Sequence, residues 1–503
     1  MADDPMARSP MADDPILIVG LGPAGAAAAT LLSAWGHTVA VIDRLGGGAG
    51  RLAESIPPST RKILRAIGAI NAVGAAEFLP WRGNTVWWAD EPARIETFPP
   101  DGPGYQVLRR DFDRCLRKVA GDAGARIVEG RVTGVQLADS SGDRHRVLVD
   151  QGGTITGFRP QIVIDASGRS GVLATGGHRV LDPARRTVAL AGSWRSDEPW
   201  PIDDHTHTLV ASYPGGWAWS VPVDAKIRQF TVMIDPARSA LARGWRSREI
   251  YLAEIAKVAP FRPILAGALL GALWGADASE YAARDHAGPG WLLAGDAGSA
   301  INPLSSFGVK KALASGWLAA VAVHTALEDA GMAAQAFAFF DRRERAVAAA
   351  AARQAAVFAK EAASDTDHPF WLVRAETAED PVDSLEPDTA VLARDPTVIA
   401  AFTELRARDS IHLVPAPDVR IEPRAAIRGR RIVMEDHLVS AAWPDGLRYL
   451  RGVDLVALMQ RAPAHRDVGE IFEAARSTTP DIALPDFLGA LSVLLAKGCL
   501  RHS

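Results

Sequence analysis

The stretch Pro15-Ile-Leu-Ile-Val-Gly-Leu-Gly-Pro-Ala-Gly25 decides the fold of this chain. Its first half is a short apolar run of the kind that a parallel sheet buries. The run ends in Gly20, Gly22 and Gly25, which have the spacing G-x-G-x-x-G, and an alanine-rich helical run follows through Leu32. The order of strand, glycine turn and helix predicts a Rossmann-like unit that binds a dinucleotide.

Each glycine of this loop has a separate task in a dinucleotide site. Gly20 permits the tight turn, Gly22 lets the backbone approach a pyrophosphate, and Gly25 lets helix and strand pack closely. Close packing without a ligand would also use small residues. However, a second apolar strand ends at Asp43, where a carboxylate can accept a hydrogen bond from a ribose hydroxyl. The residues expected at the phosphates and ribose are Gly20, Gly22, Pro23, Ala24, Gly25 and Asp43.

Composition places the chain among globular proteins of more than one domain. It has 503 residues, of which 48% are apolar and 23% charged, so two or three domains are expected. The net charge of −4 gives no electrostatic reason to expect a nucleic-acid partner. The two cysteines, Cys115 and Cys499, are far apart and lack metal-ligand spacing, which is typical of a protein from a reducing cytoplasm.

The N-terminal residues 1–14 contain a repeated Met-Ala-Asp-Asp-Pro and are expected to form a disordered tail. They are acidic and lack an apolar segment, so they predict neither a signal peptide nor an anchor. The longest uncharged run, 312–327, is shorter than the roughly 20 residues that a membrane helix needs. No membrane partner is therefore expected.

Further candidate residues follow the predicted strands. Arg44 and Arg51 flank a glycine-rich loop directly after Asp43. Asp296 follows a buried apolar run and suits a cofactor site, although it could equally cap the next helix. Trp217 and Trp219 share one face of a strand and would form a flat aromatic wall, unless they are simply two tryptophans of a sheet core.

Residues 16–345 resemble the flavin-dependent monooxygenases of the hydroxybenzoate-hydroxylase type, whose relatives include flavin-dependent halogenases. The R-x-x-F-D element of that family matches Arg109 to Asp113, its D-A-S/D-G turn matches Asp165 to Gly168, and its G-D motif matches Gly295-Asp296. The resemblance implies FAD as the cofactor. It places Arg109 at the flavin nucleotide, Asp296 at a ribityl hydroxyl, and the loop from Pro303 to Gly308 beside the isoalloxazine ring.

The segment Gly216 to Pro222 resembles the W-x-W-x-I-P element of flavin-dependent halogenases, in which it lies between flavin and substrate. Those enzymes also carry a lysine that takes up hypohalous acid, in a segment of the form F-x-x-K-x-G. Here that segment reads Phe78-Leu-Pro-Trp81-Arg82-Gly83, so Trp81 stands in the position of the lysine. Arg82 is adjacent, but a guanidinium is not a nucleophile at neutral pH. The departure favours hydroxylation, with Trp81, Arg82, Trp217 and Trp219 as catalytic candidates.

The resemblance then implies an FAD-dependent monooxygenase. Reduced flavin reacts with O₂ to give a C4a-hydroperoxide, whose terminal oxygen is attacked by an electron-rich aromatic ring. Only one complete G-x-G-x-x-G occurs, so electrons are expected from transiently bound NAD(P)H or from a separate flavin reductase. A halogenase-like frame without the lysine, together with a C-terminal extension, resembles the flavoproteins that hydroxylate a tryptophan in a partner polypeptide during tryptophylquinone biogenesis.

Three alternatives remain open at this point. They are a halogenase that uses Arg82 or a remote lysine, a reductase of the geranylgeranyl type that consumes no O₂, and a non-catalytic FAD-bound scaffold. The FAD-binding domain would be the same in all three. Bromide- or chloride-dependent product mass and O₂ consumption would separate them.

The expected architecture is α/β, with a Rossmann-like FAD-binding domain, an inserted antiparallel substrate domain and a mainly helical C-terminal domain. Four alternating runs predict the antiparallel sheet, at 188–194, 207–213, 217–221 and 229–234. The C-terminal helices weakly resemble a winged-helix module, and a helical lid or dimer contact would explain them equally well. We expect an FAD-binding domain at 15–80, 105–185 and 275–362, a substrate domain at 81–104 and 186–274, and a C-terminal domain at 363–503.

Overall fold

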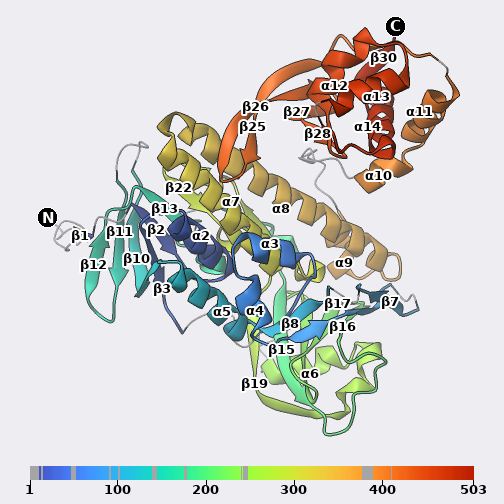
Figure 1. The fold of residues 1–503 in the computed structure, drawn as a ribbon. Helices are drawn as coiled ribbons and strands as arrows, with labels where there is room; N and C mark the ends of the chain where they lie inside the picture. The colour runs from blue at the N-terminus through green and yellow to red at the C-terminus, as the bar shows by residue number, and fades with distance from the viewer. Residues whose placement is uncertain are drawn as a thin grey trace. The chain divides into compact units, whose positions relative to one another are not determined.

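The computed structural model divides the chain into two compact units, Met1–Glu379 and Asp380–Ser503. It describes residues 11–12, 15–46, 52–89, 92–99, 102–138, 144–174, 178–239, 241, 247–376, 389–408, 410–477 and 479–503. Figure 1 shows the elements of each unit. The first unit contains both of the sheets that position the site.

A six-stranded sheet, in the order β21-β22-β13-β2-β3-β9, is the framework of the first unit. From β22 to β9 the neighbouring strands run parallel, and only β21 pairs antiparallel. The predicted apolar runs form its buried centre, because a strand covered on both faces needs side chains without polar atoms. The strands are β2 (Ile16–Val19), β3 (Val39–Asp43), β9 (Arg126–Glu129), β13 (Ile162–Asp165), β21 (Ala287–Gly288) and β22 (Trp291–Leu293).

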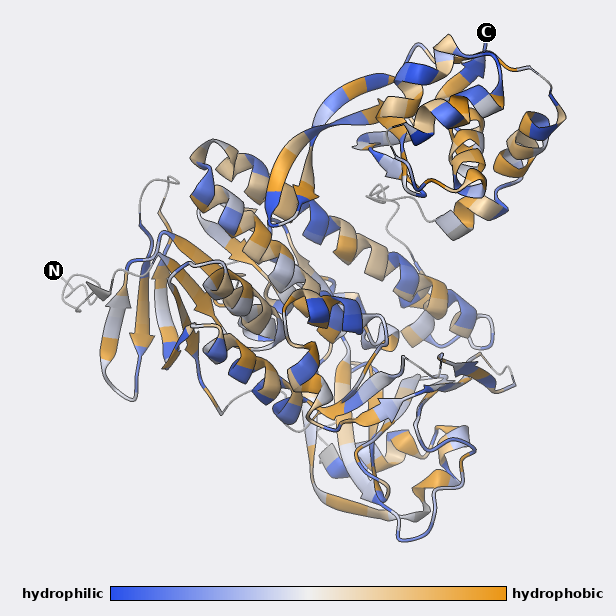
Figure 2. Ribbon diagram, viewed as in Figure 1, coloured by the Kyte–Doolittle hydropathy of each residue, from blue (hydrophilic) through white to orange (hydrophobic). Residues whose placement is uncertain are grey.

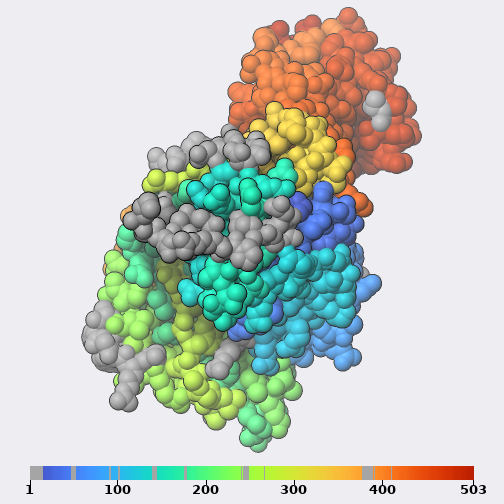
Figure 3. All heavy atoms as spheres, turned by 90° about the vertical axis from the view of Figure 1, so that its left-hand side faces the viewer, coloured from blue at the N-terminus to red at the C-terminus, as the bar shows by residue number. Residues whose placement is uncertain are grey.

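Two layers cover this sheet. Helices α2 (Pro23–Ala34) and α7 (Gly308–Glu328) pack together, and α5 (Arg109–Asp122) lies beside α2. The other face packs against a meander, whose Val147, Val149 and Phe158 join the core of β2 and β3. Figure 2 shows the central strands as predominantly hydrophobic, and Figure 3 shows the meander at the surface in teal. The meander is β10 (Arg131–Gln136), β11 (Arg146–Asp150) and β12 (Ile155–Phe158), with β1 (Met11–Ala12) paired at its edge.

The second large sheet of this unit has seven strands, in the order β19-β15-β18-β17-β16-β6-β7. The four predicted runs are confirmed as antiparallel neighbours. A core of large side chains, among them Phe230, Tyr251 and Phe261, joins this sheet to α6. The strands are β6 (Gly83–Trp87), β7 (Arg94–Thr97), β15 (Val188–Arg195), β16 (His207–Tyr213), β17 (Gly216–Pro222), β18 (Ile227–Ile234) and β19 (Ala268–Asp277), and α6 is Ser247–Ile255.

Smaller elements connect the two sheets. A three-stranded sheet runs in the order β4-β8-β5, and another in the order β14-β20-β23. Short 3₁₀ helices lie in the loops that follow several strands. These elements are β4 (Ala53–Ile56), β5 (Leu79–Trp81), β8 (Gly104–Leu108), β14 (Arg179–Leu181), β20 (Tyr281–Ala283), β23 (Ser299–Ala300), α3 (Thr60–Ala66), α4 (Ile70–Gly74), η1 (Gly168–Ser170), η7 (Gly295–Ala297) and η8 (Pro303–Ser305).

The division between the units falls at Glu379, later than residue 363, at which the C-terminal domain is expected to begin. The long helix α8 (Ala333–Ala363) is followed by α9 (Pro369–Ala375), which packs against α8. The indole of Trp371 on α9 donates a hydrogen bond to the carbonyl of Tyr213 at 2.9 Å. Residues 363–375 therefore belong to the first unit.

The second unit has a core of its own, built around Leu438, Leu455, Ile471 and Leu491. Its last helices agree with the mainly helical domain expected here, and a long antiparallel hairpin of β25 and β26 is added to them. Its elements are α10 (Thr389–Arg394), α11 (Pro396–Ala407), α12 (Leu455–Arg461), α13 (Val468–Arg476), α14 (Leu484–Ala496), β24 (Leu413–Pro415), β25 (Arg420–Arg428), β26 (Arg431–Ser440), β27 (Trp443–Leu447), β28 (Tyr449–Leu450), β29 (Val453–Asp454) and β30 (Leu500–His502).

No helix in the described residues is both long enough and apolar enough to span a bilayer.

Candidate active site

A cavity of about 1270 Å³ opens at the carboxyl ends of β2, β3 and β13. This is the edge at which open parallel sheets bind ligands. The cavity extends from the glycine loop to β17 and β19 of the seven-stranded sheet, so a single space reaches both sheets. Of the predicted residues it brings together Gly20, Gly22, Pro23, Ala24, Asp43, Arg44, Arg109, Trp217, Trp219, Asp296, Pro303 and Gly308.

The glycine loop has the geometry that its sequence requires. Gly20 has φ +95°, and a Cβ on it would lie 2.5 Å from the carbonyl oxygen of Ala166. A Cβ on Gly25 would lie 2.0 Å from the carbonyl oxygen of Gly20, so Gly25 serves helix–strand contact and does not line the cavity. A Cβ on Gly22 would meet no atom within 4 Å and would project into the cavity. The surface beside Gly22 is therefore kept clear for a ligand.

Asp43 is held at the end of β3 by backbone amides. One carboxylate oxygen accepts from the N–H of Leu21 at 2.7 Å, and the other accepts from the N–H of Leu45 at 2.8 Å. Arg117 lies 3.6 Å from the same carboxylate. With Arg44 it belongs to a group of cavity-lining guanidinium groups that complement phosphate charge, namely Arg44, Arg110, Arg114, Arg117, Arg131 and Arg169.

Arg109 begins α5 and lies between two carboxylates. It donates to Glu54 at 3.0 Å and makes two bonds to Asp113 at 3.2 Å each. Burial raises the pKa of the Glu54 carboxyl, against the opposing effect of Arg109 beside it. All three side chains line the cavity. The Arg109 guanidinium is thus fixed in one orientation before any ligand binds.

Asp165, predicted as a cofactor contact, is fully buried and does not line the cavity. Its carboxylate accepts from the N–H and hydroxyl of Ser167 at 3.0 and 2.6 Å, and from the N–H of Leu173 at 2.7 Å. These bonds hold the turn after β13, whose Ala166 and Gly168 do reach the cavity. The structure therefore gives Asp165 a positioning role.

Gly295 and Asp296 have different roles in the turn after β22. Gly295, at φ +65°, forms the turn and does not line the cavity, whereas Asp296 does. The buried ammonium of Lys311 donates to the carbonyl of Gly295 at 2.8 Å and lies 3.9 Å from the Asp296 carboxylate. Asp296 is not the N-cap of α7, which is Phe307. Asp296 therefore lines the cavity, as do Pro303 and Gly308.

Trp217 and Trp219 form a tryptophan wall on β17. Their rings stack with centroids 4.9 Å apart and planes at 29°. Trp217 is 3% exposed and packs in a core with Val86 and Met233, while Trp219 is partly exposed. The expectation of a sheet core holds for Trp217, and the expectation of an aromatic wall holds for both residues, since both line the cavity.

Two predicted residues, Trp81 and Arg82, lie elsewhere. Trp81 is buried on β5, donates from its indole N–H to the carbonyl of Gly83 at 2.7 Å and packs edge-on against Phe98. Trp81 and the exposed Arg82 are not among the described residues that line the cavity. Arg51 lies outside the described residues. The structure does not bring Trp81 and Arg82 to the tryptophan wall.

The residues present fit an FAD molecule. The open side of Gly22 and the guanidinium group suit a pyrophosphate, Asp43 suits the adenosine ribose, and Asp296 suits a ribityl hydroxyl. Sequence reasoning missed most of the arginines, because their positions on α5 and β10 give no local motif. It also missed Trp274, Gly275 and Ala276, which line the cavity from β19.

Comparison with known proteins identifies the family. A family model described as tryptophan halogenase matches residues 101–428. The tryptophan 2-halogenase of Chondromyces crocatus is 30% identical over 340 residues, which cover 65% of this chain and 64% of that protein. The match thus spans just under two thirds of that relative. This chain belongs to the tryptophan halogenase family, and the halogenase-like family expected from the sequence is confirmed.

Two solved structures share the fold over nearly the whole chain. CmlS, a flavin-dependent halogenase, has a TM-score of 0.79 at 21% identity, covering 98% of this chain and 96% of CmlS. QhpG, a peptidyl tryptophan dihydroxylase essential for tryptophylquinone cofactor biogenesis, has a TM-score of 0.66 at 23% identity, covering 97% and 100%. At these identities the likeness establishes the fold, including the expected α/β class.

Proposed function

We propose that this chain is an FAD-dependent monooxygenase that hydroxylates an aromatic ring, and that the ring belongs to a tryptophan of a partner polypeptide. One observation favours hydroxylation over halogenation. No lysine lines the cavity that contains the tryptophan wall. The chain has eight lysines, and all of them lie in its described part. An amine that could take up hypohalous acid is therefore missing from the place where the chemistry is proposed.

Lys310 and Lys311 lie between the cavity-lining residues Val309 and Ala312 in the sequence, but their own side chains do not line the cavity. The ammonium of Lys311 is buried and donates to the carbonyls of Gly295 and Ser299. Lys310 lies over the ring of Phe307, with its nitrogen 4.9 Å from the ring centroid. Burial lowers the pKa of Lys310, but Lys310 does not line the cavity. Neither supplies a free amine beside Trp217 and Trp219.

The protein's contribution would be binding, orientation and exclusion of water, while bound FAD supplies the activation of O₂. Arg109 and the glycine loop would hold the nucleotide, and Asp296 would fix the ribityl chain. The tryptophan wall would stack on the incoming ring, which is worth about 0.5–1.5 kcal/mol per aromatic pair beyond burial. The electrons would come from NAD(P)H or from a separate flavin reductase.

Halogenation is the alternative function. The names of the relatives and the TM-score of 0.79 with CmlS favour it. Among the solved structures, QhpG favours the peptidyl substrate, and its alignment includes the second unit of this chain. Binding energy also favours a polypeptide, since one aromatic ring gives little affinity, whereas a typical protein interface buries about 1,200–2,000 Å².

The test uses the full chain loaded with FAD, a chemical or enzymatic reductant, and O₂. Tryptophan-containing peptides and free tryptophan are supplied side by side, and O₂ uptake and product mass are measured. We expect coupled O₂ uptake and oxygen addition on a peptide tryptophan. Equal oxidation of free tryptophan would contradict the polypeptide substrate, and a halogenated product would contradict the reaction.

A further inference from the structure

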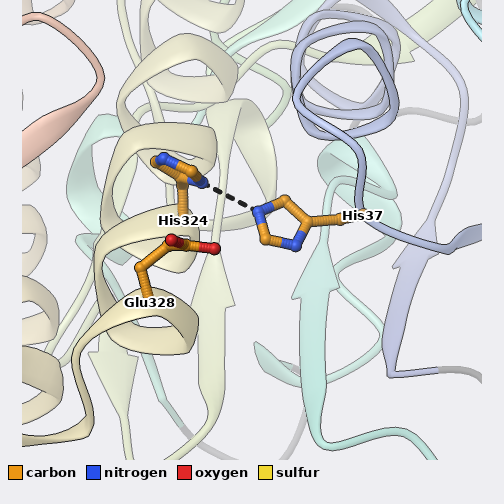
Figure 4. A group of neighbouring side chains, drawn as sticks. All are labelled: His37, His324 and Glu328. Atoms are coloured by element: carbon orange, nitrogen blue, oxygen red, sulfur yellow. Dashed lines mark hydrogen bonds between the residues drawn. The ribbon is translucent and has the colours of Figure 1, made fainter.

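Two histidines and a glutamate converge outside the cavity. His37 follows the turn after α2, while His324 and Glu328 lie on the last turns of α7 (Figure 4). The His37 Nε2 and the His324 Nδ1 are 2.8 Å apart and hydrogen-bonded. One ligand atom from each of the three side chains lies within 4.8 Å of the other two. None of these residues belongs to the cavity.

We propose that His37, His324 and Glu328 bind a divalent transition-metal ion, with Zn²⁺ the best match, that clamps the end of α2 to the end of α7. Two imidazole nitrogens and one carboxylate oxygen are a donor set that Zn²⁺ accepts, with water as the fourth ligand. Exposure agrees with that role. His324 is 9% exposed, whereas Glu328 lies at the surface, so one side of the site faces solvent.

The backbone positions of the three ligands are fixed by packing. His324 and Glu328 are four residues apart on one helix and therefore share a face. The N–H of His37 donates to the carbonyl of Leu32 at 3.0 Å, which ties it to α2. Helices α2 and α7 approach closely, since a Cβ on Gly316 would lie 2.1 Å from the carbonyl of Ala24. Such preorganisation reduces what a metal site loses in ordering its ligands.

The charge environment also suits a cation. Both α2 and α7 end at this point, and the carbonyl end of a helix carries partial negative charge. The ring centroids of Trp35 and His324 lie 5.1 Å apart, so the indole packs against one of the ligands.

Metal binding needs the exposed Glu328 side chain to swing its carboxylate toward the ion, and two small adjustments of the histidine pair. A tetrahedral ion with Zn–N distances of about 2.0–2.1 Å separates its two nitrogens by about 3.3 Å, so the rings would part by about 0.5 Å. One of the two bonded nitrogens donates a proton to the other, and both lone pairs are needed for the ion. That proton leaves the shared position when the ring changes tautomer, and both imidazoles stay neutral.

This site lies away from the chemistry of the cavity. Helix α2 has 12 residues, so its C-terminal end is about 18 Å from the glycine loop at its start. The ion would therefore stabilise the sheet-and-helix framework without touching FAD or substrate. Because it binds the folded form, it should raise the melting temperature of the protein.

The test uses the full-length protein after treatment with EDTA, titrated with ZnCl₂ in a calorimeter. We expect one Zn²⁺ per chain at micromolar concentration or tighter, and weakening by at least about tenfold in both His37→Gln and Glu328→Gln. His502→Gln is the matched control, because His502 also lies beside a carboxylate, Glu404, at 3.2 Å. It should bind Zn²⁺ as the parent does.

Further measurements distinguish a loss of metal binding from a loss of folding. Glu328 is exposed, so Glu328→Gln should fold normally, with melting temperature and flavin content unchanged when no metal is added. Co²⁺ in place of Zn²⁺ should give the visible absorption of a four-coordinate site, and this should be lost in Glu328→Gln. No stoichiometric Zn²⁺ binding by the parent, or equal binding by both ligand variants, would overturn the proposal and leave a plain hydrogen bond between histidines.

Discussion

Gly22 and Gly25 predict opposite outcomes for the same kind of substitution. Gly22 has φ −75° and ψ −171°, an extended conformation that valine adopts readily, and a Cβ there meets nothing within 4 Å. Gly22→Val should therefore fold with an unchanged melting temperature when flavin is removed from both proteins. Its side chain enters the cavity where the pyrophosphate would lie. Loss of two charge-assisted hydrogen bonds at about 1.5–3 kcal/mol each lowers FAD affinity by at least a hundredfold.

Gly25 is the matched control. A Cβ there would lie 2.0 Å from a backbone oxygen, so contact at about 3.4 Å requires a shift of about 1.4 Å between α2 and the glycine turn. Overpacking of this kind costs about 1–3 kcal/mol or more, so Gly25→Val should lower the melting temperature. Flavin titration and thermal unfolding measure both effects. A Gly22→Val protein that keeps stoichiometric FAD, or one that unfolds like Gly25→Val, would refute the assignment of the loop.

Three further predictions concern pH, the tryptophan wall and the second unit. Burial lowers the pKa of His286 to about 4, so stability should be complete above about pH 6.5 and fall by up to about 3 kcal/mol as pH drops toward 4. In His286→Gln this dependence should be reduced in thermal unfolding; an identical pH profile would count against it. Trp219→Ala should lower kcat/KM by about 2–10-fold with FAD still bound, and unchanged kinetics would remove the indole from the substrate site. Deletion of residues 380–503 should leave flavin bound but abolish capture and oxidation of a polypeptide substrate, and full activity of the truncated protein would contradict this.

Much of the framework could be predicted because its signals are local. The apolar run before Gly20 and the three glycines are contiguous in sequence, and the acid that ends β3 follows within the same short βαβ segment. Alternation predicted four strands of the antiparallel sheet. Strand β19 was not foreseen, since its Ala, Gly and Leu residues lack β-branched side chains. It forms because β15 supplies its hydrogen-bond partners, with a bulge between Ala191 and Ser193. Such pairing is tertiary information.

The candidate site was predicted less evenly. A motif gives the position of a residue in the chain but not the direction of its side chain. Asp165 belongs to the expected turn, yet three hydrogen bonds direct its carboxylate into the turn. Trp81 aligns with a lysine position, but packing against Phe98 holds its indole in the interior. The arginines along the cavity come from separate elements, and only the folded chain brings them together.

The most direct test of the central claim follows the atom that is added to the aromatic ring. The full chain with FAD and reductant would turn over a tryptophan-containing peptide under ¹⁸O₂ with excess bromide, and the product would be analysed by mass spectrometry. The proposed function predicts incorporation of heavy oxygen into the tryptophan ring and no bromine isotope pattern. A brominated product without heavy oxygen would contradict it and establish this chain as a halogenase.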